Sequence, residues 1–98
     1  MRKDGERITS IRYVKMHRRI HWLEQQTDRR VHELTLTDAA VCSHEREFVL
    51  GKVTDMSCRP IAGNSWFLYL HTDEGLFAFE TEEHPEPFIR SYKNLKKW

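Results

Sequence analysis

The sequence contains few cysteines, prolines and glycines, and their scarcity excludes several kinds of protein. Its two cysteines, Cys42 and Cys58, cannot build the disulfide framework of a small secreted domain, and they are too far apart in the chain for the paired spacing of a structural zinc site. The four glycines are scattered singly, so there is no glycine-rich loop to hold a phosphate group. No run of about 18 apolar residues is present that would form a membrane-spanning helix.

The start of the sequence lacks the features of a secretory signal peptide. Residues 1–7 are mostly charged and lead into no long apolar segment. We expect this segment to be disordered, and we expect the protein to be cytoplasmic. In that compartment Cys42 and Cys58 would stay reduced and would pack as small apolar side chains.

The rest of the composition is that of an ordinary globular domain. Hydrophobic residues make up 39% of the chain and charged residues 32%, which does not fit a disordered protein. Three Trp, three Tyr and five Phe provide large apolar surfaces for a core. Because 98 residues suit a single hydrophobic core, we assign residues 1–98 to one domain.

The second half of the sequence predicts a β-hairpin. Residues 65–72 are rich in aromatic and branched side chains, and a second such run occupies residues 76–81. Between them Asp73 and Glu74 precede Gly75, which we expect to take a positive φ angle in the turn. The two runs would therefore pair as neighbouring antiparallel strands.

Four β-rich runs precede this hairpin and are separated by turn-forming residues. They occupy residues 31–37, 40–43, 47–50 and 52–59. Residues 60–64 contain proline, glycine and asparagine, so we expect a loop there. The sequence as a whole predicts a protein made mainly of antiparallel strands.

Residues 8–25 fit either a helix or a strand. Four apolar residues are spaced as on one face of a helix, namely Tyr13, Met16, Ile20 and Leu23. The branched residues at the start of the segment favour a strand instead. We favour the strand, and we expect residues 27–30 to form the turn that brings it back onto the strand at residues 31–37.

After residue 81 the apolar pattern becomes that of a helix. Pro85 and Pro87 suit the beginning of a helix, where a missing backbone N–H costs little. The apolar residues that follow recur at helical spacing and are Phe88, Ile89, Tyr92 and Leu95. We expect a C-terminal helix over about residues 86–97 that packs its apolar face on the sheet.

Two groups of polar residues could be read as a metal site or a catalytic site. Cys42, His44, Cys58 and His71 could be assembled into a zinc set, but without close spacing we expect core cysteines and surface histidines. Cys42 and His44 could also act as a nucleophile and its base, yet no third residue is marked that would orient the histidine. We therefore expect no catalytic residue, no metal and no cofactor, and we predict that the protein is not an enzyme.

Charge is distributed unevenly although the net charge is only +1. Residues 1–30 carry 9 basic and 4 acidic residues, residues 31–89 carry 3 and 11, and residues 90–98 carry 4 basic residues and no acidic ones. The first segment supplies a candidate basic face for a ligand or partner, made of Lys15, Arg18, Arg19, Arg29 and Arg30. The simpler alternative is that these are ordinary solvated charges.

Two further segments suggest a family. Residues 34–41 (LTLTDAAV) read as a strand, a turn with an Asp and a second strand, and residues 48–56 (FVLGKVTDM) read as a short strand followed by another. Together with the hairpin and the final helix, this order resembles the bacterial pleckstrin-homology-like domains, relatives of the GRAM type. The resemblance implies an antiparallel β-barrel or roll of about seven strands in two nearly orthogonal sheets, with a C-terminal α-helix closing one end.

The resemblance also implies a binding function. With no catalytic set in the sequence, our main hypothesis is a non-catalytic binding or adaptor module for a protein or peptide partner. Family members that bind phosphoinositides carry basic residues around the first hairpin, so binding of anionic lipid headgroups at a membrane surface is one alternative. Binding of single-stranded nucleic acid is a weaker one, because the acidic middle of the chain would repel phosphates. Pairing through an exposed strand edge could also give a homodimer.

Overall fold

The computed structural model describes residues 6–21 and 24–96, and it describes side chains outside residues 16–28. The chain forms seven strands, a short 3-10 turn and one helix. In order, these are β1 (Arg7–His21), β2 (Glu24–Thr37), β3 (Ala40–Cys42), β4 (Glu47–Val49), η1 (Leu50–Lys52), β5 (Val53–Ile61), β6 (Ser65–Thr72), β7 (Gly75–Thr81) and α1 (Glu86–Leu95).

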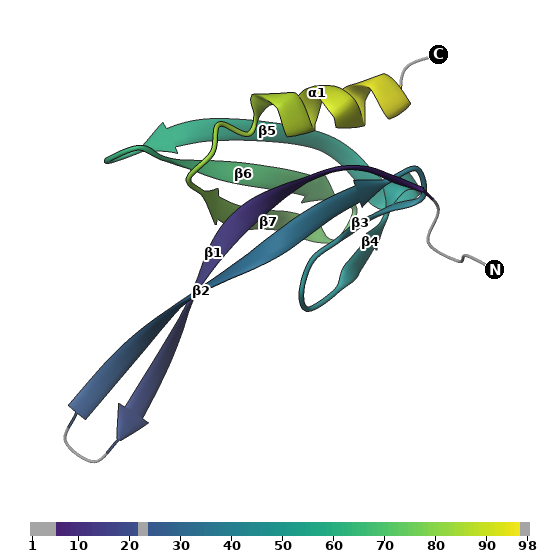
Figure 1. Cartoon of the computed structure of the whole chain (residues 1–98). Coiled ribbons are helices and arrows are strands. Elements are labelled where there is room, and N and C mark those ends of the chain that lie inside the picture. The colour runs from purple at the N-terminus through teal and green to yellow at the C-terminus, as the bar shows by residue number, and fades with distance from the viewer. Residues whose placement is uncertain (1–5, 22–23, 97–98) are drawn as a thin grey trace.

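All seven strands are antiparallel and form one curled sheet in the order β4-β3-β2-β1-β7-β6-β5 (Figure 1). This confirms the prediction of a mainly β protein with a C-terminal helix. The sheet consists of two meanders, β1–β4 and β5–β7, which among the described residues are joined by a single residue pair, Val14 with Glu80. The edge strands β4 and β5 do not pair with each other within the described residues, so the sheet is open and the expected barrel is not closed.

The core lies between the inner faces of the two meanders and α1. Alternate residues of the paired strands point inward, as the pleat of a strand requires. Leu34 and Leu36 of β2 and Leu68 and Leu70 of β6 are all fully buried. The apolar face of α1 completes this core with Phe88, Ile89 and Tyr92.

The hairpin predicted in the second half of the chain is present as β6 and β7. Gly75 has a φ angle of +130°, as expected for a turn position that favours glycine. The predicted loop at residues 60–64 is wrong in its first two residues, because Pro60 pairs with Trp66 and Ile61 pairs with Ser65. Proline is tolerated there because β5 is an edge strand, where a missing N–H need not cost a ladder hydrogen bond.

The strand interpretation is correct for residues 8–21, which lie in β1, whereas residues 22–23 lie outside the described residues and residues 24–25 already belong to β2. The predicted turn at residues 27–30 is wrong, because those residues lie inside β2 and pair with β1. The register of the β1–β2 pair explains why the turn does not form at residues 27–30, since Ile11 lies opposite Leu34 and both side chains face the core. A slip of one residue would turn the apolar side chains outward.

The far half of this hairpin projects from the body of the molecule, and we call it the β1–β2 arm (residues 15–30; Figure 1). The other end of β1 is held in place. We expected residues 1–7 to be disordered, yet Glu6 and Arg7 belong to the fold. The backbone N–H of Glu6 donates to Asp38 Oδ1 (3.0 Å), and the N–H of Asp38 donates to the Glu6 carbonyl oxygen (3.1 Å).

Candidate functional site

The five residues of the predicted basic face all lie in the β1–β2 arm. Lys15 and Arg30 are directly paired across the two strands and therefore share one face. Arg29 precedes Arg30 along β2 and lies on the opposite face. Arg18 and Arg19 are likewise successive residues of β1, and their side chains lie outside the described ones. The pleat of the arm thus distributes the five positions over both of its faces.

Acidic residues from the middle of the chain neutralise part of this charge. Glu45, in the loop between β3 and β4, forms an ion pair with Lys15. Glu82, just after β7, forms an ion pair with Arg29. All four side chains are at least one-third exposed, so each pair stabilises the fold by only about 0–1 kcal/mol. The pairs do cancel positive charge where an anionic ligand would need it.

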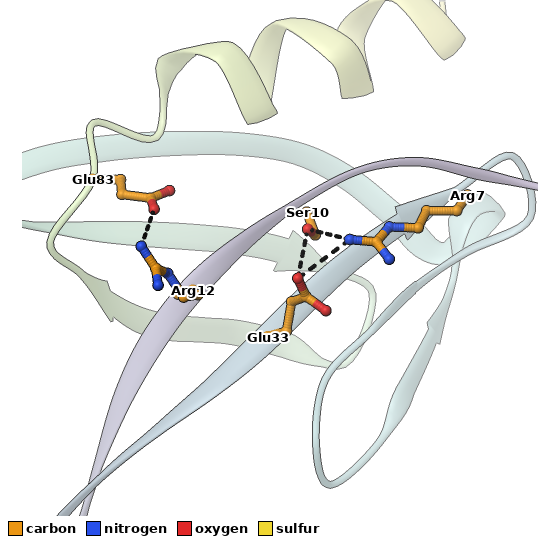
Figure 2. Close-up of polar contacts among 5 residues, drawn as sticks. All are labelled: Arg7, Ser10, Arg12, Glu33 and Glu83. Carbon is orange, nitrogen blue, oxygen red and sulfur yellow. Dashed lines mark hydrogen bonds and ion pairs between the residues drawn. The ribbon is translucent and has the colours of Figure 1, made fainter.

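Two more groups of polar contacts cover the outer face at the base of the arm (Figure 2). Arg12 Nη2 lies 3.1 Å from Glu83 Oε2, which fixes the segment between β7 and α1 against β1. Nearer the N-terminus, Arg7 Nη2 and Ser10 Oγ both donate to Glu33 Oε2, at 3.3 and 2.9 Å. The acidic middle of the chain therefore folds back onto its basic start.

The residues of the hypothetical zinc set do not form a metal site. Within the described part of the chain, no three His, Cys, Asp or Glu side chains are grouped to hold a metal ion. Cys42 lies in β3 and Cys58 in β5, on strands that are not neighbours in the sheet. The ring of His44 stacks on that of His32, with the ring centroids 4.1 Å apart.

The pairing of β5 with β6 brings His71, a member of the hypothetical zinc set, next to Ser57, which the sequence did not single out. Ser57 Oγ lies 2.8 Å from His71 Nε2, the kind of contact that joins a nucleophile to its base. Asp55 is paired with His71 in the ladder, but its carboxylate accepts a hydrogen bond from the N–H of Met56. No hydrogen bond between Asp55 and His71 occurs among the described residues. The arrangement that would orient a catalytic histidine is thus incomplete.

A groove of about 480 Å³ opens where the two meanders separate. It lies between the end of β1 that enters the arm, the β3–β4 loop, and strands β6 and β7. We call it the aromatic groove because its lining includes Tyr13, Phe48, Phe67, Phe77 and Phe79. Ligand sites are commonly concave and mainly apolar with a few polar groups at the rim, and this groove has that composition.

The aromatic rings of the floor are packed against one another. The centroid of Phe48, which is 5% exposed, lies 4.9 Å from that of Phe77. Tyr13 meets Phe79 edge-to-face at 4.9 Å. The hydroxyl oxygen of Tyr13 accepts a hydrogen bond from the backbone N–H of His44 at 3.0 Å, which fixes the ring. The floor is therefore preformed, and a ligand would not need to order it.

Charged side chains stand around the rim. Lys15 is paired with Glu45, and Arg46 Nη2 lies 2.9 Å from Glu74 Oε1. The fourth charged residue of the lining, Glu80, is half-buried and makes no ion pair within the part of the chain that the structure describes. Among the described side chains the rim thus carries one carboxylate that no neighbouring cation neutralises.

The groove follows an edge of β7 that is only partly paired with another strand in the described residues. Within the described residues β7 pairs with β1 only at Glu80, opposite Val14, and the two strands diverge from that point. Residues 75–79 of β7 pair with β6 on one side. Their other edge meets no strand in the described ranges, and such an edge can accept an extended chain as an additional strand.

The sequence predicted the strand at residues 76–81 but did not predict the aromatic groove. Alternation along that strand puts Phe77 and Phe79 on one face, and both rings are half-buried and pack against the core. The groove itself exists because β1 leaves β7 after one residue pair, and no local pattern in the sequence encodes that divergence. Arg46 and Glu80 carried no sequence signal beyond their charge.

A smaller groove of about 320 Å³ separates β5 from α1. Its floor includes Met56 and Ile89, which are buried, and the half-buried Cys58. Burial and then the negative charge of Glu86 raise the pKa of the Cys58 thiol, which keeps it protonated and unreactive. Pro60 lies in the adjoining edge strand and hinders strand addition, so the aromatic groove is the better candidate site.

Comparisons of the chain with protein-family models, curated proteins and solved structures gave no significant match. The function must therefore be inferred from the geometry of the site itself. In the ranges 6–21 and 24–96, no helix is long and apolar enough to cross a membrane.

Proposed function

We propose that the protein is a non-catalytic binding module that holds a peptide segment of a partner protein in the aromatic groove. One observation carries this proposal: a preformed apolar floor lies directly beside the unpaired edge of β7. A strand edge supplies backbone hydrogen bonds to an extended peptide, and a neighbouring pocket supplies selectivity for its side chains. Both parts of such a site are present here.

The arrangement of the elements supports the resemblance to pleckstrin-homology-like domains. Two antiparallel meanders followed by a C-terminal helix are the elements that the resemblance implied. The resemblance implies binding to lipid headgroups, peptides or protein partners, and the present proposal takes the peptide. A cytoplasmic setting is part of the same proposal, because the thiols of Cys42 and Cys58 would stay reduced there.

The lipid and nucleic-acid alternatives have weaker support. Both need a continuous positive surface, whereas Arg29 and Arg30 lie on opposite faces of the arm and Glu82 pairs with Arg29. A membrane-binding role would show as flotation with phosphatidylserine vesicles that salt weakens and that Arg29→Glu/Arg30→Glu abolishes. That result would replace the peptide proposal.

A selection from phage-displayed random peptides, followed by affinity measurements, tests the proposal. Ala78→Arg would place a long side chain in the groove from an exposed position of β7. Val49→Arg is the matched control, because Val49 is an exposed strand residue of β4 that neither lines the groove nor belongs to the edge of β7. Selected peptides should bind the wild type and Val49→Arg but not Ala78→Arg. Equal binding to both variants, or no selected peptide, would contradict a peptide site in the groove.

A further inference from the structure

We propose that the aromatic groove selects a positively charged side chain, an arginine or a lysine, in the middle of an extended peptide. This inference rests on the proposed function and specifies which peptides the groove would bind. The cation would be attracted by the carboxylate of Glu80, and its aliphatic stem would lie on the ring of Phe67, which shares a face of the sheet with Glu80. Three observations support this selectivity.

The first observation is that the groove already accommodates a guanidinium group of its own chain. The guanidinium carbon of Arg46 lies 4.7 Å from the ring centroid of Phe48 and 4.7 Å from that of Phe77. A cation within about 6 Å of a ring centroid is attracted by the negative face of the ring. These two rings lie on the other face of β7 from Glu80 and already hold Arg46, so they show that the aromatic lining accommodates a cation and leave the Glu80 end of the groove for the ligand.

The second observation is the charge of the rim. Lys15 is paired with Glu45 and Arg46 with Glu74, so an anionic ligand would have to compete with a carboxylate for either cation. A cationic ligand meets no such competition at Glu80, which makes no ion pair in the described ranges. Charge complementarity thus favours a basic peptide over an acidic one.

The third observation is where Glu80 lies. Glu80 is the residue of β7 that pairs with β1 within the described residues. It therefore lies at the end of the unpaired edge where the two strands meet. Phe67 is directly opposite Glu80 in the β6–β7 ladder and also lines the groove, so an apolar ring and a carboxylate share one face. A peptide added along residues 75–79 would span about 3.3 Å per residue. A basic side chain near one end of a five-residue segment would therefore reach Glu80.

An uncharged apolar side chain is the main competing occupant. It would also gain from the aromatic floor, but it would bury the rim carboxylate without a partner, which costs free energy. A basic side chain covers the ring of Phe67 with its methylene groups and leaves its charge beside the carboxylate of Glu80. The difference in affinity between a basic and an apolar peptide therefore tests this selectivity separately from peptide binding itself.

The test uses five-residue fluorescein-labelled peptides that are identical except for one residue, which is Arg, Lys, Leu or Glu. Fluorescence anisotropy at low salt would measure their affinity for the wild type, Glu80→Gln and Glu47→Gln. Glu47 is an exposed carboxylate of β4 outside the groove lining, so its variant is the control for loss of one negative charge. Circular dichroism would verify that all variants are folded.

We expect the Arg and Lys peptides to bind wild type and Glu47→Gln about fivefold more tightly than the Leu peptide, and the Glu peptide to bind most weakly. Glu80→Gln should remove most of that advantage, and so should added salt. A Leu peptide that binds as tightly as the Arg peptide, with binding lost in Ala78→Arg, would overturn the inference and leave the peptide-binding function intact. Binding that no groove variant alters would overturn both.

Discussion

The hydroxyl group of Tyr92 donates a hydrogen bond to the backbone carbonyl oxygen of Val53, with the two oxygen atoms 2.8 Å apart. Both residues are buried, so neither polar group can turn to water instead. The bond joins the middle of α1 to the first residue of β5. The helix is thus held on the sheet by a specific polar contact as well as by its apolar face.

Replacing Tyr92 by phenylalanine should lower the free energy of unfolding by about 1–3 kcal/mol, because the buried carbonyl group of Val53 would lose its partner. Urea denaturation at neutral pH measures the change. Tyr69→Phe is the control, since the hydroxyl of the half-buried Tyr69 makes no hydrogen bond in the described part of the structure. Equal effects of the two variants would show that the bond to Val53 contributes nothing of its own.

The same tyrosine should make stability depend on pH under alkaline conditions. Burial, and then the negative charge of Asp55, raise the pKa of Tyr92 above its ordinary value of about 10. The folded state therefore holds this proton more tightly than the unfolded state, and its stabilising effect is complete below about pH 10 and lost as the pH rises further. Urea denaturation at increasing alkaline pH should show a steeper loss in the wild type than in Tyr92→Phe. Parallel curves would mean that Tyr92 is not responsible.

Leu68 and Leu76 allow a direct comparison of a buried and an exposed leucine in one hairpin. Leu68 is fully buried in the core, whereas Leu76 is 57% exposed. Leu68→Ala should lower the free energy of unfolding by about 2–5 kcal/mol, because it removes apolar contacts and leaves a cavity. Leu76→Ala should change it by less than about 0.5 kcal/mol. Comparable losses in urea denaturation would contradict the observed packing of the sheet.

Comparing alanine substitutions at Gly75 and Gly51 measures the stability cost of a positive φ angle without a contribution from steric clashes. An added Cβ would meet no atom within 4 Å at either position, so neither substitution causes a clash. Gly75 has a φ of +130°, which side chains disfavour, and Gly75→Ala should cost about 1–3 kcal/mol of stability. Gly51→Ala should have little effect or stabilise slightly, because alanine restricts the unfolded chain. A thermal melting temperature that falls equally in both variants would refute the role of φ.

Much of the strand pattern could be predicted from the sequence, because strand formation and burial follow local alternation. Leu68 and Leu70 are inward neighbours on one strand, and Asp73, Glu74 and Gly75 form the turn that their types predict. The period of Phe88, Ile89 and Tyr92 likewise gave the helix and its buried face. The helix ends at Leu95, two residues before the predicted limit.

Register and long-range contacts could not be predicted in the same way. The prediction placed a turn at residues 27–30 because their residue types are typical of turns. In the folded chain these residues belong to β2, in the register that pairs Ile11 with Leu34. The neutralisation of Lys15 by Glu45 joins residues that only the folded chain brings together. The prediction of a single basic face did not take account of the pleat of a strand, which places Arg29 and Arg30 on opposite sides of the arm.

The sequence by itself determined a mainly β chain with the β6–β7 hairpin and a C-terminal helix with its buried face, because these depend on side-chain type and on periods of two and 3.6 residues. Only the tertiary structure decided where the two meanders join. Among the described residues that junction is a single pair, Val14 with Glu80, and beyond it the strands diverge to form the aromatic groove. Strand pairing between distant segments depends on the packing of the whole core, and so the candidate site is a property of the fold and of no local motif.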